Sequence, residues 1–274
     1  MVAAAPEATI TVDSTADTLA AGNGECTLRE ALMNANADAD TTGGDCAAGS
    51  GADVIELPAG TYTLAIAGGG EDGNATGDLD VLDSLTINGA GAGTTIISGN
   101  SLDRVLHVVG TATEVVINAV TIADGYSTLG ARTGGGGLLN EEAMLSMNDC
   151  VVSNNLVDGG DFAIGGGIGN IDGALVINNC MVTDNQILAT LLYAGGGIGN
   201  AAWSGVASLS VMHSDVFSNS APGGGGILNG TGTEVTATLT QNEQFSNISP
   251  HDLLFIDTET TGLAGAGTLA FMVG

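Results

Sequence analysis

The sequence predicts an all-β solenoid, a chain wound into stacked coils, and two observations support this prediction. A glycine-rich phrase that closes on Asn occurs four times, at 134–140, 165–170, 195–200 and 223–229, and the closing Asn residues are 30, 30 and 29 positions apart. A period of this length is typical of repeats that stack on one another. Each phrase is followed by a run in which apolar residues tend to alternate with polar ones, and alternation indicates strands with one buried face.

The alternating runs place the solenoid in the chain. The four that follow the glycine phrases, and two earlier ones of the same character, are 145–155, 175–185, 209–219, 237–247, 85–100 and 115–125. We therefore expect a coil that begins near residue 54 and makes about seven turns of about 30 residues. The predicted organisation is an N-terminal strand and helix segment over 1–52 and one continuous solenoid over 53–274, with the glycine and Asn repeats at 134–247.

Glycine and asparagine have separate predicted roles in the repeat. Consecutive glycines allow positive φ and close backbone approach, so we expect them at a corner of the coil. Asn residues at equal phase can adopt left-handed conformations and can stack as side-chain amide ladders between turns. A phosphate-binding loop is excluded, because its motif requires a Lys and all 3 basic residues of the chain are Arg.

The chain is strongly acidic, with 31 Asp and Glu against 3 basic residues and a formal net charge of −28. Such a surface repels phosphates and anionic lipid headgroups, so nucleic acid is excluded as a partner. No apolar run is long enough for a transmembrane helix, so we expect no membrane insertion. The charge attracts cations, and either a solvated acidic coat or defined metal sites would account for it.

Residues 26–37 form the one clearly predicted helix. Thr27 and Glu30 have the spacing of a capping box. An apolar stripe follows at Leu28, Ala31, Leu32 and Ala35. A helix before a solenoid can cover the open end of the first coil. We therefore interpret Thr27, Arg29 and Glu30 as structural cap residues, with Arg29 anchoring the cap rather than acting in catalysis.

Several segments together resemble the CSLREA-motif family. The segments are ECTLREALMNAN at 25–36, DVIELPAGTYTL at 53–64, GDLDVLDSLTINGAG at 77–91, DRVLHVV at 103–109 and the GGGI-N repeats. Thr27 stands where the motif has Ser, which keeps a hydroxyl cap. The resemblance covers nearly the whole chain. It implies a secreted or cell-surface protein with a right-handed parallel β-helix and a mainly structural or adhesive role.

The four cysteines form two different pairs. Cys26 and Cys46 flank the predicted helix, and a disulfide between them would close a loop of about 20 residues and contribute about 3 kcal/mol. Such a bond suits a secreted protein. Cys150 and Cys180 share one repeat phase, so we expect them to stack on neighbouring turns as small core residues, free or incidentally bridged. Ala3–Ala5 before Pro6 resemble the end of a signal-peptide cleavage site, so we expect a mature secreted chain.

Enzymatic activity finds little support in the sequence. Parallel β-helices often carry polysaccharide lyases and hydrolases, which need a basic residue beside acids or clustered Asp with His. The basic and His residues of this chain are scattered: Arg29, Arg104, Arg132, His107, His213 and His251. No GxSxG nucleophile turn occurs. A polysaccharide-active enzyme is therefore an alternative and not the main prediction.

The densest acidic segment, 71–80, is the candidate metal site. Glu71, Asp72, Asn74, Asp78 and Asp80 offer oxygen ligands of the kind that Ca²⁺ prefers. The segment lacks the order of an EF-hand loop, so a solvated acidic loop is the competing interpretation. No other cofactor is expected.

Aromatic residues in the loops are the candidate binding residues. Tyr193 and Trp203 flank the third glycine phrase, and Tyr126 lies in another loop. Exposed aromatic rings can contact a glycan or a protein partner, although padding of a coil corner would account for them equally.

The main functional prediction is an extracellular or cell-surface structural or adhesive module without catalytic activity. Its expected partners are other copies of itself or components of a cell surface or matrix, with a glycan as a further option. One alternative is a fibre subunit that stacks end to end, because the apolar segment 265–274 has no capping helix after it.

Overall fold

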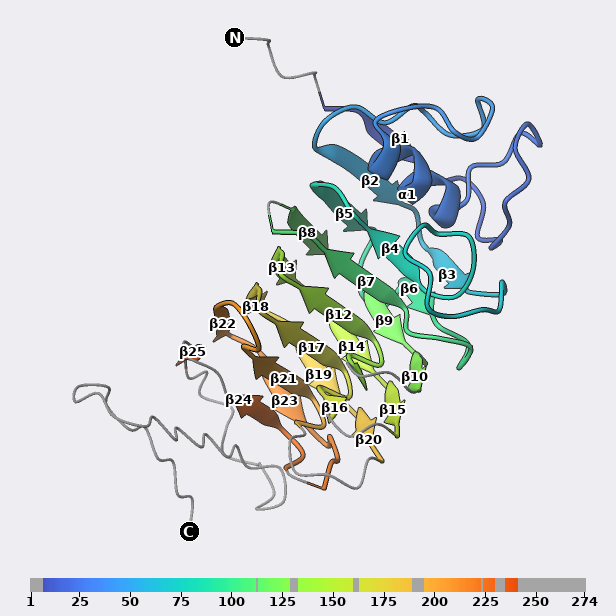
Figure 1. Cartoon of the computed structure of the whole chain (residues 1–274). Coiled ribbons are helices and arrows are strands. Elements are labelled where there is room, and N and C mark those ends of the chain that lie inside the picture. The colour runs from blue at the N-terminus through green and yellow to red at the C-terminus, as the bar shows by residue number, and fades with distance from the viewer. Residues whose placement is uncertain are drawn as a thin grey trace, which may run out of the picture.

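The structure is an all-β parallel solenoid, which confirms the predicted fold class (Figure 1). It is a computed structural model and describes residues 7–111, 113–128, 133–159, 163–188, 195–222, 224–229 and 235–240. Among these residues, three long sheets contain eight, six and six strands. The described residues make about five turns, fewer than the seven predicted for the whole of 53–274. Several predicted features lie outside the described residues, namely Ala3–Ala5, Arg132, Tyr193, His251, 265–274 and the part of the run 237–247 after residue 240.

Sheet 1 takes one strand from each turn and one from the N-terminal segment. In spatial order its strands are β1 (Thr9–Thr11), β2 (Asp53–Leu57), β5 (Leu85–Gly89), β8 (Glu114–Asn118), β13 (Met144–Asn148), β18 (Ala174–Asn178), β22 (Ala207–Met212) and β25 (Val235–Thr240). Equivalent residues of successive turns are register partners, as Asn148 and Asn178 are. The 30-residue period is therefore the length of one turn.

Sheets 2 and 3 complete each turn. Sheet 2 consists of β3 (Gly60–Thr63), β6 (Thr95–Ser98), β9 (Thr121–Ala123), β14 (Val151–Ser153), β19 (Met181–Thr183) and β23 (Asp215–Phe217). Sheet 3 consists of β4 (Leu79–Val81), β7 (Leu106–Val109), β12 (Leu138–Glu141), β17 (Ile168–Ile171), β21 (Ile198–Ala201) and β24 (Ile227–Asn229). Two short sheets consist of strands that follow a strand of sheet 2 and precede the next strand of sheet 3 in the chain. The first contains β10 (Tyr126–Thr128), β15 (Leu156–Asp158) and β20 (Gln186–Ile187). The second contains β11 (Thr133–Gly134) and β16 (Ala163–Ile164).

The core lies inside the coil and consists of stacked aliphatic side chains. On sheet 1, Ile87 pairs with Ile117, which pairs with Met147, and Met147 pairs with Ile177. All four side chains are fully buried. Burying one such side chain stabilises a fold by about 1.5–3 kcal/mol, so these continuous columns hold the turns together.

Asparagine side chains form ladders between turns, as predicted from their equal phase. In the ladder at the end of sheet 3, Asn140 donates to Asn170 at 2.6 Å and Asn170 donates to Asn200 at 2.6 Å. Asn200 then donates to Asn229 at 2.7 Å. A second buried ladder joins Asn155, Asn185 and Asn219, and a half-buried one joins Asn88, Asn118, Asn148 and Asn178.

The left-handed positions of the repeat differ from the prediction. The residues of the second buried ladder, Asn155, Asn185 and Asn219, are not among the described residues with positive φ. The residue before each of them is, with φ values of 56° at Asn154, 56° at Asp184 and 55° at Ser218. The reason is geometric. The ladder amide must point into the coil toward the next turn, and the residue before it makes the bend. The glycine corners agree with the prediction, because Gly165 has φ 68° and a Cβ there would meet the carbonyl oxygen of Ile168.

The N-terminal segment packs on the first turn. Helix α1 (Leu28–Ala37) lies at the N-terminal end of the stack and contacts β2 and β4 (Figure 1). Thr27 is its N-cap, and Thr27 and Glu30 exchange the two hydrogen bonds of a capping box. Its buried Arg29 pairs with Asp17 at 2.6 Å. Arg29 also donates to the carbonyl oxygens of Gly77 and Asp78, so the helix is tied to the loop that precedes β4.

The cysteines have two different states. Cys26 and Cys46 form a disulfide with a Cα–Cα distance of 4.8 Å, as predicted. Cys150 and Cys180 are free and buried. They stack on neighbouring turns, and the Cys150 N–H donates to the Cys180 sulfur at 3.3 Å. This is the predicted arrangement of two small core residues at one repeat phase.

Candidate functional site

A cavity of about 630 Å³ lies beside the first turns of the solenoid. Its walls come from the loop between β3 and β4, the loop between β6 and β7, and strands β7, β10 and β12. We call it the acidic cavity. Its charged and aromatic lining residues are Glu71, Asp72, Asp78, Asp103, Arg104, His107, Tyr126 and Glu141.

Strand register brings an acid and an imidazole together under this cavity. Asp80 of β4 is the register partner of His107 of β7. Their neighbours Leu79 and Leu106 are fully buried in the core. Because side chains alternate between the two faces of a strand, Asp80 and His107 lie side by side on the outer face.

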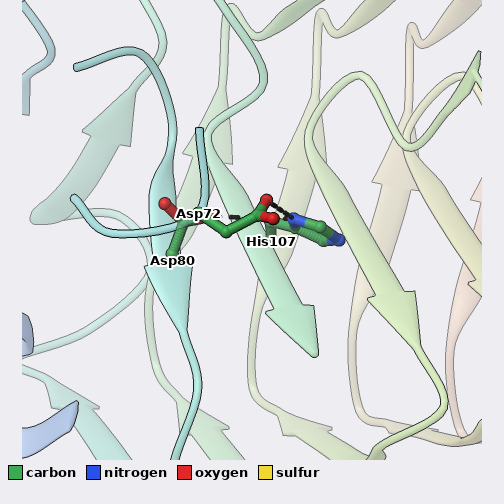
Figure 2. Close-up of side chains that lie close together, drawn as sticks. All are labelled: Asp72, Asp80 and His107. Carbon is green, nitrogen blue, oxygen red and sulfur yellow. Dashed lines mark ion pairs between the residues drawn. The ribbon is translucent and has the colours of Figure 1, made fainter. Parts of the chain in front are cut away.

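A third group from the loop completes a cluster of potential ligands (Figure 2). The Nδ1 atom of His107 lies 3.6 Å from Oδ1 of Asp80 and 3.7 Å from Oδ1 of Asp72. One ligand atom from each residue lies within 4.8 Å of the other two. At this spacing one cation can contact all three, and we call the three residues the His–Asp cluster.

The two carboxylates of this cluster differ in their surroundings. The Asp80 side chain is 0% exposed, whereas that of Asp72 is 72% exposed. Oδ2 of Asp80 accepts a hydrogen bond from the Asn74 N–H at 3.2 Å, but its Oδ1 is buried without a hydrogen-bond partner. Oδ1 is also the atom that faces the imidazole.

His107 lies between acids on both sides of its ring. Nε2 lies 3.4 Å from Oε2 of Glu141, on the opposite side from Asp72 and Asp80. Burial alone would lower the pKa of His107, but the carboxylates of Asp80 and Glu141 outweigh burial and raise that pKa above its ordinary value.

Asp78 and Arg104 form an ion pair on the cavity wall. Nη1 of Arg104 lies 3.0 Å from Oδ2 of Asp78, and Nε of Arg104 donates to the carbonyl oxygens of Gly134 and Gly135. Burial raises the pKa of Asp78 to about 6, although Arg104 opposes the shift. Burial also raises the pKa of Asp103. The cavity therefore contains carboxyl groups that hold protons more strongly than exposed ones.

The five acidic and amide residues singled out from the sequence have different environments. Asp72 and Asp80 join the His–Asp cluster, and Asp78 pairs with Arg104. Glu71 accepts backbone hydrogen bonds from Gly73 and Thr76. Asn74 exchanges side-chain hydrogen bonds with the backbone of Asp80. Glu71 and Asn74 therefore shape the loop, and the Ca²⁺ interpretation of the whole segment stays a prediction.

The aromatic binding candidates do not all come together. Tyr126 is the first residue of strand β10 and does not lie in a loop, contrary to the sequence-based expectation. It lines the acidic cavity, and its hydroxyl donates to Asp158 at 3.3 Å. Trp203 is 36% exposed and lies in a loop whose backbone N–H groups donate to Asp172, outside that cavity. Tyr193 lies outside the described residues, so its predicted pairing with Trp203 stays a prediction.

Sequence reasoning missed four charged residues of the site, namely Asp103, Arg104, His107 and Glu141. It treated His107 as isolated because the three His residues of the chain lie far apart and none stands in a Gly-His-Gly element. A signal existed: Leu79-Asp80-Val81 and Leu106-His107-Val108 have the same apolar–polar–apolar pattern. Aligned as neighbouring turns, these two strands place Asp80 beside His107.

Comparisons of the chain with models of protein families, with curated proteins and with solved structures give no match. Among the described residues, the helix is too short and too polar to cross a membrane. The acidic cavity offers a cluster of potential cation ligands, a carboxyl group with a raised pKa and the aromatic ring of Tyr126.

Proposed function

We propose that this protein is an extracellular or cell-surface structural module, with an adhesive rather than a catalytic role. In this proposal the coil is right-handed and is closed by its N-terminal helix. The observation that supports a structural role most directly is the set of three asparagine ladders.

In each ladder, hydrogen bonds between the side-chain amides of equivalent Asn residues join neighbouring turns of the coil. Each amide in the middle of the buried ladders donates to the next turn and accepts from the previous one, at 2.6 Å on both sides of Asn170. Asn170 and Asn185 are both fully buried. Oδ1 of Asn140, at the first turn of its ladder, is buried without a hydrogen-bond partner, whereas the amides in the middle of the buried ladders both donate and accept. Chains of satisfied buried hydrogen bonds rigidify a structure. The repeated Asn residues therefore make the coil stiff, and a stiff coil suits a stalk or a matrix component.

Other features favour a location outside the cell. The Cys26–Cys46 disulfide closes the cap segment, and disulfides persist mainly in oxidising compartments. A net charge of −28 keeps copies soluble and discourages contact with nucleic acid. The partners we propose are other copies of the chain or surface and matrix components, including glycans.

Retention on cells tests the adhesive role. Fluorescently labelled full-length protein would be added to intact cells and matrix of the source organism, followed by washing in physiological salt. We expect retained label that excess unlabelled protein displaces. Label that washes away as completely as a scrambled acidic protein of equal charge would contradict the adhesive role.

A polysaccharide-active enzyme is the second candidate, and the acidic cavity favours it. Burial raises the pKa of Asp78 to about 6, so the carboxyl group is protonated in a fraction of the molecules near neutral pH. The protonated form can act as a general acid. Tyr126 at the same cavity offers a ring on which a sugar can stack.

Incubation with a panel of neutral and acidic polysaccharides tests this second candidate. New reducing ends, lost in an Asp78→Asn variant, would establish the enzyme and contradict the non-catalytic proposal. Absence of product across the panel would remove the enzyme. End-to-end stacking stays a prediction, because the segment that motivates it, 265–274, lies outside the described residues.

A further inference from the structure

We propose that Asp72, Asp80 and His107 bind a divalent first-row transition-metal ion, with Zn²⁺ as the reference ion. The proposal is independent of the structural role above. The ligand atoms are one carboxylate oxygen from each Asp and Nδ1 of His107, which all lie within 4.8 Å of one another.

The orphaned oxygen of Asp80 is the first argument. Oδ1 of Asp80 is buried, has no hydrogen-bond partner and lies 3.6 Å from Nδ1 of His107. A buried charged acceptor without a hydrogen bond destabilises the folded chain. A cation in the gap between this oxygen and the imidazole would remove this destabilisation.

The orientation of the imidazole is the second argument. Glu141 faces Nε2 at 3.4 Å, while Nδ1 faces Asp72 and Asp80. A metal-binding His usually donates its other N–H to a carboxylate or carbonyl, which fixes the tautomer and the ring. Glu141 is placed to accept that N–H, which leaves the lone pair of Nδ1 directed at the gap.

The distances fit a site that closes slightly around an ion. Metal–ligand bonds of about 2.1 Å place neighbouring ligand atoms about 3.0–3.4 Å apart. The two distances from Nδ1 are 3.6 Å and 3.7 Å. Asp80 and His107 are held by their strand pairing, while Asp72 is 72% exposed on a loop and can approach. Asp80 and His107 are therefore two ligands in fixed positions, and Asp72 is a third ligand whose position can adjust.

The donor set selects the class of metal. Imidazole suits Zn²⁺, Co²⁺, Ni²⁺ and Cu²⁺, whereas Ca²⁺ and Mg²⁺ take oxygen ligands almost exclusively. Three protein ligands leave further coordination positions for water or a ligand oxygen. His107 and Asp72 also line the acidic cavity, so those positions would be accessible from it. The overall negative charge raises the local concentration of any cation.

Isothermal titration of the chelator-treated full-length protein with ZnCl₂ and, separately, CaCl₂ tests the proposal. We expect one Zn²⁺ site that His107→Gln and Asp80→Asn each weaken by more than 100-fold. Glu141→Gln should weaken it about 10- to 100-fold, as loss of an outer-shell partner does. Glu114→Gln is the control, because it also removes one acid, but from an exposed position on β8.

A spectroscopic measurement keeps the test decisive if a variant fails to fold. Histidine ring NMR of the wild-type protein should show metal bound at Nδ1 of His107 when Zn²⁺ is added. Absence of a wild-type Zn²⁺ site, equal affinity in the His107→Gln variant, or Zn²⁺ binding that leaves the His107 ring resonances unchanged would overturn the proposal. Binding of Ca²⁺ in preference to Zn²⁺ would also overturn it.

Discussion

At the scale of single residues, the molecule depends on a few buried polar side chains with assigned partners. Asn170 is fully buried and has a ladder neighbour on either side. Asp17 is nearly buried, with its side chain 5% exposed, and holds Arg29. Loss of a partner leaves the other group buried and unsatisfied, which costs more than the hydrogen bond itself contributes.

Asn170→Ala should lower the free energy of unfolding by about 3 kcal/mol. It deprives both Asn140 and Asn200 of a ladder partner, and each buried unsatisfied group costs about 1–3 kcal/mol. Asn118→Ala is the matched control on the half-buried ladder and should cost about 1 kcal/mol. Urea unfolding measures both. Equal losses of unfolding free energy in the two variants would contradict the claim that the buried ladder stabilises the fold more than the half-buried one.

The ion pair of Asp17 should make stability depend on pH in a defined direction. Burial opposes ionisation of Asp17, but hydrogen bonds from Arg29 and from the N–H groups of Ala65 and Ile66 outweigh burial, so the pKa lies below its ordinary value of 3.8. A lowered folded-state pKa gives stability that is complete above the unfolded-state pKa and is lost as pH falls through the folded-state pKa.

The stability gap between wild type and Asp17→Asn should therefore be constant above about pH 5 and should narrow below about pH 4. Its size at neutral pH should be about 3 kcal/mol, because the buried Arg29 loses its charged partner. Urea unfolding at several pH values tests this, with Glu114→Gln as a control for loss of an exposed acid. A gap that widens in acid would contradict the assignment.

At the scale of elements, the corners of the coil restrict the sequence most. Gly165→Ala should destabilise the protein by about 2 kcal/mol or more, because φ is 68° there and the new Cβ would meet the Ile168 carbonyl oxygen. Gly93→Ala is the control, since nothing lies within 4 Å of a Cβ at that position and φ is not left-handed. Thermal unfolding should give a lower melting temperature for Gly165→Ala than for Gly93→Ala. Equal melting temperatures would contradict the claim that the corner requires glycine.

The stability of the N-terminal segment, residues 7–52, should depend on its disulfide. Cys26→Ser with Cys46→Ser should lower stability by about 3 kcal/mol for a loop of 20 residues. Wild-type protein under reducing conditions should show the same drop. An equal free energy of unfolding for the reduced and the oxidised wild-type protein would mean that the disulfide does not stabilise the N-terminal segment.

Much of the fold could be predicted because the repeat is regular where its glycine phrases stand. Asn140, Asn170 and Asn200 lie 30 residues apart and are register partners. The candidate site lies in earlier turns whose loops vary. Asp80 and His107 pair across 27 residues, and His107 and Leu139 across 32. A fixed period therefore does not align Asp80 with His107, whereas the apolar–polar–apolar pattern that their two strands share does.

At the scale of the whole molecule, the net charge of −28 dominates behaviour in solution. Like charges on one compact body repel, and added salt screens exposed charges within a Debye length of about 10 Å at 0.1 M. The melting temperature should therefore rise by several degrees between about 10 mM and about 300 mM NaCl. A melting temperature that falls with salt would mean that exposed ion pairs matter more than repulsion.

The most direct test of the proposed extracellular role is the location of the protein on intact cells of the source organism. Immunogold electron microscopy, combined with protease treatment of unbroken cells, measures it. We expect gold label outside the cytoplasmic membrane and loss of that label after protease treatment. Label confined to the cytoplasm and resistant to protease until the cells are broken would contradict the proposal.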